Sequence, residues 1–251
     1  MVKVLKFGGS SLADAEQFKK VAAIIKAEPE RRYVVASAPG KRFSEDIKVT
    51  DMLYDCYKLV KANQPIDDAF KLIEDRYNGI IKDLGINLWL QPEFDRIKNA
   101  IVHHAGRDYI ASRGEYLNSM VLASYIGYDF IDAEDGIFFR ENGTLDEEKT
   151  NEELTKILAE HEHAVIPGFY GVMPNGTIKT LQAQLLQEQL RLISTKTGQM
   201  FPVCLWLTQD ALTTQRLLKQ LPMQSFVSFH IWAQPLCTRM QFSLFVKWVF
   251  R

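Results

Sequence analysis

The chain has 251 residues, of which 47% are hydrophobic, and its formal net charge at pH 7 is −1. This length and composition are ample for a hydrophobic core and exclude a disordered or fibrous protein. The near-neutral charge gives no reason to expect nucleic acid as a partner. We find no run of roughly eighteen apolar residues and no signal-peptide pattern, so we expect a cytoplasmic protein without a membrane segment. Three scattered cysteines predict reduced thiols rather than disulfides.

The composition changes sharply after residue 180. Residues 1–180 contain 29 acidic and 23 basic residues, a net charge of −6, whereas residues 181–251 contain 2 and 7, a net charge of +5. Glutamine occurs 3 times in the first part and 11 times in the second, while glycine occurs 13 times and once. The second part also has little helical or strand periodicity. We therefore expect one domain over residues 1–180 and no confident fold over 181–251.

The N-terminal segment alternates strand, turn and helix. A β-branched and apolar run over residues 2–7 precedes the glycine pair at 8–9, and apolar residues spaced for one helix face continue to about Pro29. Residues 33–37 form a second apolar strand, which leads into a second turn over 38–41. Two strands joined by a helix make a βαβ unit and predict a parallel sheet.

The alternation continues through the first part of the chain. Three helical stretches follow the second turn, and we expect them to form a block on one edge of the sheet. We expect Ser-Arg-Gly-Glu at 112–115 to open another helix, with Glu115 in its first turn. Strands are predicted at 128–132 and 164–166, with a helix over 150–161 between them. The fold class is therefore α/β, a three-layer αβα sandwich with a mainly parallel central sheet.

Chemistry in such a fold is expected at the carboxyl ends of the strands, where open α/β sheets bind ligands. Lys6 and the turn over residues 8–10 place an ammonium group and backbone N–H groups at a helix N-terminus, which suits phosphate oxygens. The same residues also suit a tight turn, and they are not the GxxxxGK[ST] nucleotide loop. The turn over 37–41 fits a ligand loop or a surface loop equally well. Glu115 and the turn over 167–171 likewise have structural interpretations, as a helix start and a tight turn.

Two histidine pairs, at 103–104 and 161–163, and two acidic clusters, at 132–135 and 146–148, were considered as metal ligands. No acidic or cysteine partner is spaced to close a site around the histidines, so we expect them to be solvated or to cap helices. The acidic clusters are typical of loops and helix starts. We therefore expect no metal site formed by these side chains.

The order and spacing of five motifs resemble the aspartate kinases of the amino acid kinase family. The motifs are Lys-Phe-Gly-Gly-Ser-Ser at 6–11, Ser-Ala-Pro-Gly-Lys at 37–41, Val-Thr-Asp at 49–51, Ser-Arg-Gly-Glu at 112–115 and Pro-Gly-Phe-Tyr-Gly at 167–171. They span nearly all of the first 180 residues, and the first motif is specific to the family. The resemblance implies transfer of the γ-phosphoryl group of ATP, with Mg²⁺, to the β-carboxylate of L-aspartate, towards lysine, threonine and methionine. It also implies a homodimer for the intact family member.

The resemblance further implies which residues bind the phosphates. Lys6 would neutralise charge on the transferring phosphoryl group and would be the catalytic residue. Gly8, Gly9 and Ser10 would donate backbone hydrogen bonds to the phosphates. Such positioning and charge stabilisation is most of what phosphoryl transfer requires, because the aspartate carboxylate needs no base to deprotonate it.

The substrate-binding residues implied by the resemblance are Glu115, Thr50 and Phe169. Glu115 would accept the ammonium group of the amino acid, Thr50 would help to seat it, and Phe169 would wall the site. Kinases of acetylglutamate, glutamate or uridylate share the sheet and the glycine turns, and they remain alternatives. A catalytically dead binding fragment is a further alternative.

After residue 180 the family would continue into a Ser-Arg-Gly-Gly-Ser-Asp motif, which this sequence lacks. That motif supplies the family's arginine for the substrate carboxylate and its second glycine turn near the phosphates. When the possible codons of residues 196–216 are read one base upstream, synonymous choices allow a segment that resembles the family's ATP-binding segment. The same one-base shift over residues 223–239 allows a second segment that resembles the family. We therefore interpret residues 181–251 as an out-of-frame tail, with a genuine unrelated segment as the alternative, and expect the chain as given to be inactive or nearly so.

Overall fold

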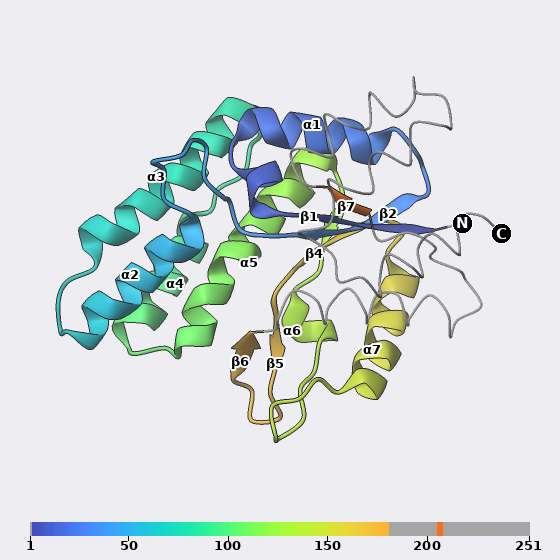
Figure 1. Cartoon of the computed structure of the whole chain (residues 1–251). Coiled ribbons are helices and arrows are strands. Elements are labelled where there is room, and N and C mark those ends of the chain that lie inside the picture. Colours follow the sequence, from blue (N-terminus) through green and yellow to red (C-terminus); the bar gives the residue numbers. More distant parts are fainter. Residues whose placement is uncertain (1, 181–204, 208–251) are drawn as a thin grey trace, which may run out of the picture. The chain divides into compact units, whose positions relative to one another are not determined.

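The computed structural model describes residues 2–180 and 205–207 of the chain. The chain divides into two compact units, Met1–Gln209 and Asp210–Arg251, and all described residues belong to the first. A parallel sheet with the strand order β3-β4-β2-β1-β7 runs through this unit (Figure 1). Its strands are β1 (Lys3–Phe7), β2 (Arg31–Ala36), β3 (Asp129–Phe130), β4 (Ala164–Pro167) and β7 (Leu205–Leu207).

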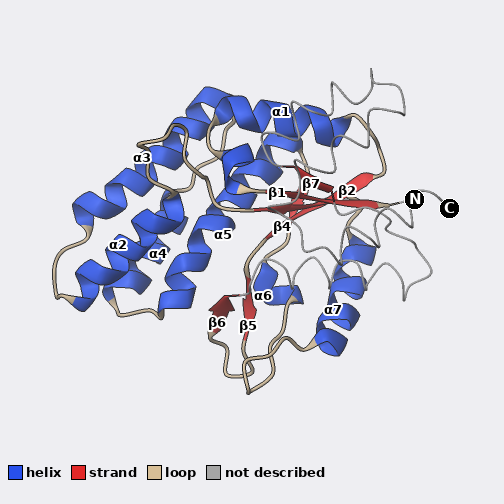
Figure 2. Ribbon diagram, in the orientation of Figure 1, coloured by secondary structure: helices blue, strands red, loops and turns tan. Residues whose placement is uncertain are grey.

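Helices lie on both sides of this sheet, which confirms the predicted α/β class (Figure 2). They are η1 (Gly9–Leu12), α1 (Ala15–Lys26), α2 (Val49–Lys61), α3 (Asp67–Leu84), α4 (Gln91–Val102), α5 (Arg107–Ile126), α6 (Ala133–Gly136) and α7 (Glu147–Glu160). In Figure 1, α1 lies on one side of the sheet and α7 on the other. The Tyr33 hydroxyl group on β2 donates a buried hydrogen bond of 2.8 Å to the carbonyl oxygen of Leu158 on α7.

Helix α1 forms where the apolar spacing predicts it. The side chain of Asp14 accepts a hydrogen bond from the backbone N–H of Gln17 and thereby caps the first turn. The stripe of Phe18, Val21 and Ile25 is fully buried. This stripe is the apolar face with which α1, the helix that connects β1 to β2, packs into the core.

Helices α2, α3 and α4 pack around α5 and form the predicted helical block. Phe70 of α3 and Phe94 of α4 meet edge to face, with ring centroids 6.5 Å apart. Helix α3 ends at Gly85, whose φ of 67° lies in the left-handed region that favours glycine. Helix α5 is buried on nearly every side, so all four residues of the 112–115 motif are buried.

The prediction that residues 112–115 open a helix is wrong. Helix α5 begins at Arg107, after the extended N-cap residue Gly106, and Glu115 is its ninth residue. The helix starts earlier because Asp108 occupies the first turn, where a carboxylate is favourable. Glu115 therefore does not lie at a helix start, and the helix dipole does not explain why a carboxyl group is buried in the third turn.

Strand β3 is shorter than the predicted strand over 128–132. Asp132 leaves the sheet to cap α6, and its side chain accepts a hydrogen bond from the backbone N–H of Glu134 at 3.2 Å. Asp146 caps α7 in the same way. Both acidic clusters thus lie at a loop or a helix start, as predicted.

A small antiparallel pair, β5 (Tyr170–Val172) and β6 (Ile178–Thr180), follows β4 and was not predicted. The backbone N–H of Thr180 donates to Asp108 Oδ2 at 3.1 Å, which ties the end of this pair to the start of α5. The tail over 181–251 lies outside the described residues except for β7, which pairs with β1. None of the described helices is long and apolar enough to span a membrane.

Candidate active site

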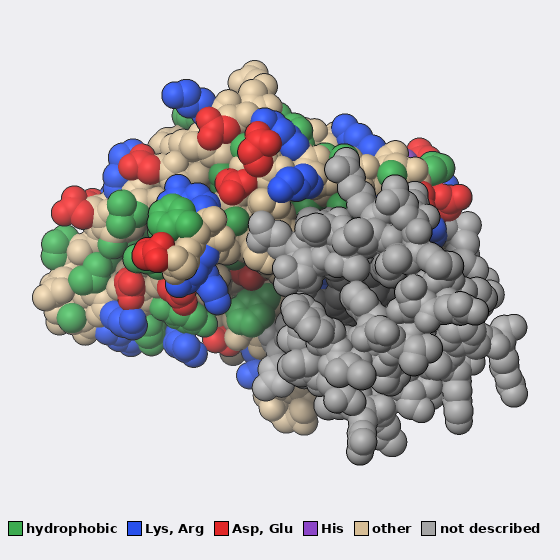
Figure 3. Space-filling model, turned by 45° about the horizontal axis from the view of Figure 1, so that its top comes forward, with side chains coloured by type: hydrophobic (Ala, Val, Ile, Leu, Met, Phe, Trp, Pro, Cys, Tyr) green, Lys and Arg blue, Asp and Glu red, His purple; other side chains and the backbone are tan. Residues whose placement is uncertain are grey.

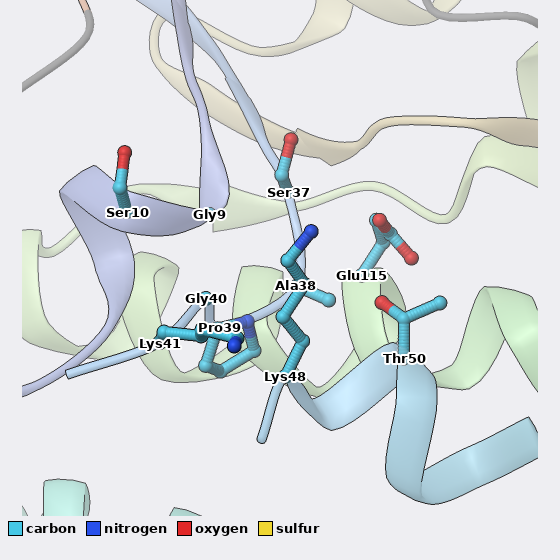
Figure 4. Close-up of a pocket in the computed structure, with 10 residues that line it drawn as sticks. All are labelled: Gly9, Ser10, Ser37, Ala38, Pro39, Gly40, Lys41, Lys48, Thr50 and Glu115. Carbon is cyan, nitrogen blue, oxygen red and sulfur yellow. The ribbon is translucent and has the colours of Figure 1, made fainter. Parts of the chain in front are cut away.

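A pocket of about 400 Å³ lies beyond the carboxyl ends of β1 and β2 (Figure 4). Four segments contribute to it: the first glycine turn, the turn after β2, the start of α2 and the middle of α5. The lining residues are Gly9, Ser10, Ser37, Ala38, Pro39, Gly40, Lys41, Lys48, Thr50 and Glu115. The fold therefore brings together four of the five motifs on which the sequence resemblance rests.

The two glycine turns meet main chain to main chain. The Gly40 N–H donates to the Gly9 carbonyl oxygen at 2.8 Å. A Cβ at Gly40 would lie 2.6 Å from the Gly9 carbonyl carbon, and a Cβ at Gly9 would lie 2.7 Å from the Ala38 oxygen. Both positions therefore require glycine for close approach. Gly8 differs, because a Cβ there would meet nothing within 4 Å.

The first glycine turn does not lie at an α-helix N-terminus as predicted. It leads into η1, which spans four residues, and α1 begins only at Ala15 behind its own cap. The α-helix whose N-terminus reaches the pocket is α2, since Lys48 is its N-cap residue and Thr50 lies in its first turn. Figure 4 shows the side chains of Lys48 and Thr50 on the same side of the pocket as the start of this helix.

Glu115 is a buried carboxyl group in the pocket wall, with a relative exposure of 6%. Its Oε2 atom has no hydrogen-bond partner among the described residues. Burial raises the pKa of Glu115 to about 7, although a hydrogen bond from the Ala38 backbone N–H opposes this rise. The positive charge of Lys6 also opposes it. The pocket thus presents an acceptor oxygen that the described protein leaves unsatisfied.

Three predicted site residues do not line the pocket: Lys6, Gly8 and Phe169. Lys6 is buried on β1, opposite Val35 of β2, and its charge acts on Glu115. Phe169 is the second residue after β4 and adopts a φ of 80°, which is strained for an aromatic residue. The structure therefore groups Gly9, Ser10, Thr50 and Glu115 most closely.

An ion-pair cluster centred on the buried Asp46, which we call the Asp46 clamp, holds the turn after β2. It consists of Arg42, Asp46 and Arg76. Arg76 of α3 donates to Asp46 Oδ2 at 2.8 Å and to the Gly40 carbonyl oxygen at 2.7 Å. Arg42 donates to Asp46 from its backbone N–H and from its guanidinium group, and these bonds hold the pKa of Asp46 well below its usual range. The clamp thereby fixes Gly40 against Gly9.

Arg113 has a different environment from Arg76, although both are buried. Its guanidinium carbon lies 4.5, 4.8 and 5.0 Å from the ring centroids of Tyr109, Tyr116 and Tyr170, respectively. Its nitrogens donate to the Ser112 hydroxyl group, and it forms no ion pair with a described carboxylate. Because Tyr170 belongs to β5, this aromatic cage ties α5 to the segment that follows β4.

Sequence reasoning missed Lys48, which lines the pocket, and Asn118, which holds the lining residue Ser37. Asn118 lies one helical turn after Glu115 on α5, and its side-chain N–H group donates to the Ser37 carbonyl oxygen at 2.6 Å. Lys48 immediately precedes the Val-Thr-Asp motif. The helical spacing from Glu115 was the available signal for Asn118, and adjacency to a motif was the signal for Lys48.

The histidine pairs and acidic clusters considered as metal ligands all lie in the described part of the chain. Over residues 2–180 and 205–207, no group of three or more His, Cys, Asp or Glu side chains is placed to hold a metal ion. His103 and His161 are the C-cap residues of α4 and α7, in agreement with the prediction. Figure 3 shows acidic and basic side chains interspersed over the described part of one face, so this face has no continuous basic surface.

Comparison with known proteins shows which family the chain resembles. The model of the amino acid kinase family matches residues 1–185. Aspartokinase 3 of Bacillus subtilis is 30% identical over 196 residues, covering 71% of this chain and 42% of that protein. The crystal structure of Clostridium acetobutylicum aspartate kinase superposes with a TM-score of 0.75 and 44% identity, covering 77% of this chain and 45% of that chain.

A more distant solved structure shares the fold. Aspartokinase III of E. coli, in complex with aspartate and ADP, matches with a TM-score of 0.62 and 20% identity, covering 76% of this chain and 47% of that chain. The chain thus spans less than half the length of these relatives. The family match, in contrast, covers most of this chain. From its fold, its glycine turns and this match, the chain belongs to the amino acid kinase family.

Proposed function

We propose that this chain contains the catalytic part of an ATP-dependent aspartate kinase, which transfers the γ-phosphoryl group of ATP to the β-carboxylate of L-aspartate. The observation that supports this most directly is the pocket, where two glycine turns in main-chain contact face a buried carboxyl group with an unpartnered oxygen. Such a pocket suits phosphate oxygens at one end and an ammonium group at the other. The 44% identity with an aspartate kinase supports the same substrate pair.

Lys6, Gly8, Gly9 and Ser10 would act on the phosphates. Lys6 is buried in β1 and directs positive charge towards the pocket region, where it would stabilise negative charge on the transferring group. No general base is required, because a carboxylate is already the nucleophile. Mg²⁺ would enter bound to ATP, and we assign it no ligand among the described residues.

Glu115, Thr50 and Phe169 would select the amino acid. An ammonium group on the free Glu115 oxygen would satisfy the buried acceptor and favour its ionised form. Thr50 lines the same pocket and would contact the substrate beside it. Phe169 lies two residues beyond the end of β4, where its ring would wall the substrate site.

We further propose that residues 181–251 are an out-of-frame tail and that the chain as given turns over little or no substrate. The change of composition after residue 180 and the end of the family match at residue 185 support this proposal. Sequencing the coding DNA across codons 170–251 and translating all three frames tests it. A frame that encodes Ser-Arg-Gly-Gly-Ser-Asp and Asp-Pro-Arg segments is the expected result, and the absence of both from every frame would refute the frameshift.

Phosphorylation assays test the substrate. A frame-corrected chain should release ADP with L-aspartate in preference to N-acetylglutamate, L-glutamate or UMP, and the chain as given should show little release with any of them. Preference for another acceptor would contradict the assignment. In the frame-corrected chain, Lys6→Ala should lower kcat about 100-fold or more while the circular dichroism spectrum is retained. Unchanged turnover in that variant would refute the role of Lys6.

A further inference from the structure

Lys48 is positioned by the main chain although its side chain is exposed. It is the N-cap residue of α2, and its carbonyl oxygen accepts the Met52 N–H at 3.1 Å. The next residue, Val49, donates its N–H to the Pro39 carbonyl oxygen at 3.2 Å. Asp46 of the clamp lies two residues earlier in the chain. These backbone hydrogen bonds fix the position of the Lys48 main chain, from which the side chain extends.

The Lys48 side chain extends into the pocket. Figure 4 shows its ammonium group directed towards Ser37, on the side of the pocket where the Glu115 carboxyl group also lies. Its ammonium group forms no hydrogen bond or ion pair that the structure describes. A lysine ammonium group carries three donors, and the polar residues Ser37, Thr50 and Glu115 line the same pocket.

Lys41 also lines the pocket, but its ammonium group is hydrogen-bonded within the protein. Its ammonium group donates to the Ser44 carbonyl oxygen at 3.1 Å, within its own turn. In Figure 4 it lies beside Pro39, apart from the Glu115 side of the pocket. Lys41 is thus folded back on its loop, whereas Lys48 reaches into the cavity.

The charges around the pocket are complementary to a ligand with both signs of charge. Glu115 offers an unsatisfied carboxylate oxygen on α5, and Lys48 offers an ammonium group from the start of α2. The positive end of the α2 dipole adds to the field at Lys48. A ligand that joins an ammonium group to an anionic group would contact both.

We infer that Lys48 is a ligand-binding residue that pairs with an anionic oxygen of the bound substrates. This inference rests on the proposed function for the identity of those substrates. Two sources share the chemistry, namely a carboxylate of the amino acid and a phosphate of the nucleotide. Lys48 belongs to none of the segments that the sequence resemblance marks as phosphate- or substrate-binding.

Protection from acetylation tests the inference on the full chain without requiring turnover. The chain would be treated with an amine-acetylating reagent, alone, with L-aspartate or with inorganic pyrophosphate, and modification of each lysine would be followed by peptide mass spectrometry. We expect Lys48 to be modified at least fivefold more slowly in one of the two ligand arms. Lys58, an exposed lysine of the same helix that pairs with Asp55, is the internal reference and should not change. Protection by L-aspartate identifies the carboxylate as the source, and protection by pyrophosphate identifies the phosphate.

Equal modification of Lys48 in all three arms would overturn the inference. Protection by pyrophosphate, combined with no phosphorylation of L-aspartate by the frame-corrected chain, would leave Lys48 as an anion site and reject the proposed substrate. Variants add a second measurement: Lys48→Met should weaken binding of the protecting ligand about tenfold, and Lys48→Arg should restore most of it. Lys58→Met should bind like the unmodified sequence. Full affinity in Lys48→Met would also overturn the inference.

Discussion

Two buried carboxyl groups near the pocket, Asp46 and Glu115, differ in how the protein satisfies them. Both have relative exposures below one tenth, 7% for Asp46 and 6% for Glu115. Asp46 accepts four hydrogen bonds of 2.8 to 2.9 Å, three from Arg42 and one from Arg76. Glu115 keeps one oxygen without any described partner. Their pKa values accordingly move in opposite directions, that of Asp46 downward and that of Glu115 upward to about 7.

The difference indicates which carboxylate stabilises the fold and which is available to a ligand. A buried charge costs several kcal/mol unless donors compensate it, and Asp46 receives its donors from the protein. Glu115 receives too few, so the folded protein bears a cost that a bound ammonium group would offset. The clamp and the free carboxylate are therefore parts of one arrangement, because the first holds the pocket wall that the second faces.

Removing the satisfied carboxylate should have the largest effect. Asp46→Ala leaves the guanidinium group of Arg76, whose side chain is 3% exposed, without its counter-ion. We expect a loss of about 3–5 kcal/mol in the free energy of unfolding, measured by urea denaturation followed by circular dichroism. Asp46→Asn, which keeps one acceptor oxygen, should lose less. A loss below about 1 kcal/mol in Asp46→Ala would show that the clamp does not hold this part of the fold.

Glu115 and Asp46 should make the free energy of unfolding depend on pH in opposite senses. Because the folded-state pKa of Glu115 is raised from 4.5 to about 7, stability should fall as the pH rises through this window. The expected loss is about 2–4 kcal/mol between pH 4.5 and pH 8, at about 1.4 kcal/mol per pKa unit. Asp46 contributes stability that is present above its usual value of 3.8 and lost as the pH falls below it.

Glu115→Gln is the variant that isolates this contribution. It should remove most of the decrease between pH 4.5 and pH 8 and should be more stable than the parent at pH 8, as urea denaturation at the two pH values would measure. Arg42 and Arg76 are unchanged in it, so the loss of stability at acid pH should persist. An identical decrease in parent and variant would mean that Glu115 is not the titrating group.

Sequence reasoning recovered the parts of this arrangement that are local in the chain. The β-branched runs and glycine pairs predicted the first βαβ unit, and the resemblance to the aspartate kinases implied that Gly9, Ser10, Thr50 and Glu115 share one site, where the structure places them together. The carboxyl ends of parallel strands converge at one sheet edge, so motifs placed after strands meet there. Glu115 was identified as a site residue even though its position in α5 was predicted wrongly.

The parts that sequence reasoning missed depend on long-range packing. Arg76 contacts Asp46 and Gly40, which lie 30 and 36 residues earlier in the sequence. The sequence of its helix, α3, shows only the periodic apolar residues of one buried face. No local rule distinguishes this arginine from an exposed one. The early start of α5 was hidden for a related reason, since a helix buried on nearly all sides lacks the polar and apolar alternation that marks a helix boundary.

The smallest effect is expected at the exposed member of the clamp. The Arg42 side chain is 44% exposed, whereas that of Arg76 is 3% exposed, so solvent screens its charge. Arg42→Ala keeps the backbone N–H bond to Asp46 and leaves the Arg76 pair intact. We therefore expect a loss of only about 0.5–1 kcal/mol by urea denaturation. A loss as large as that in Asp46→Ala would mean that Arg42, rather than the buried Arg76 pair, supplies most of the compensation for the Asp46 charge.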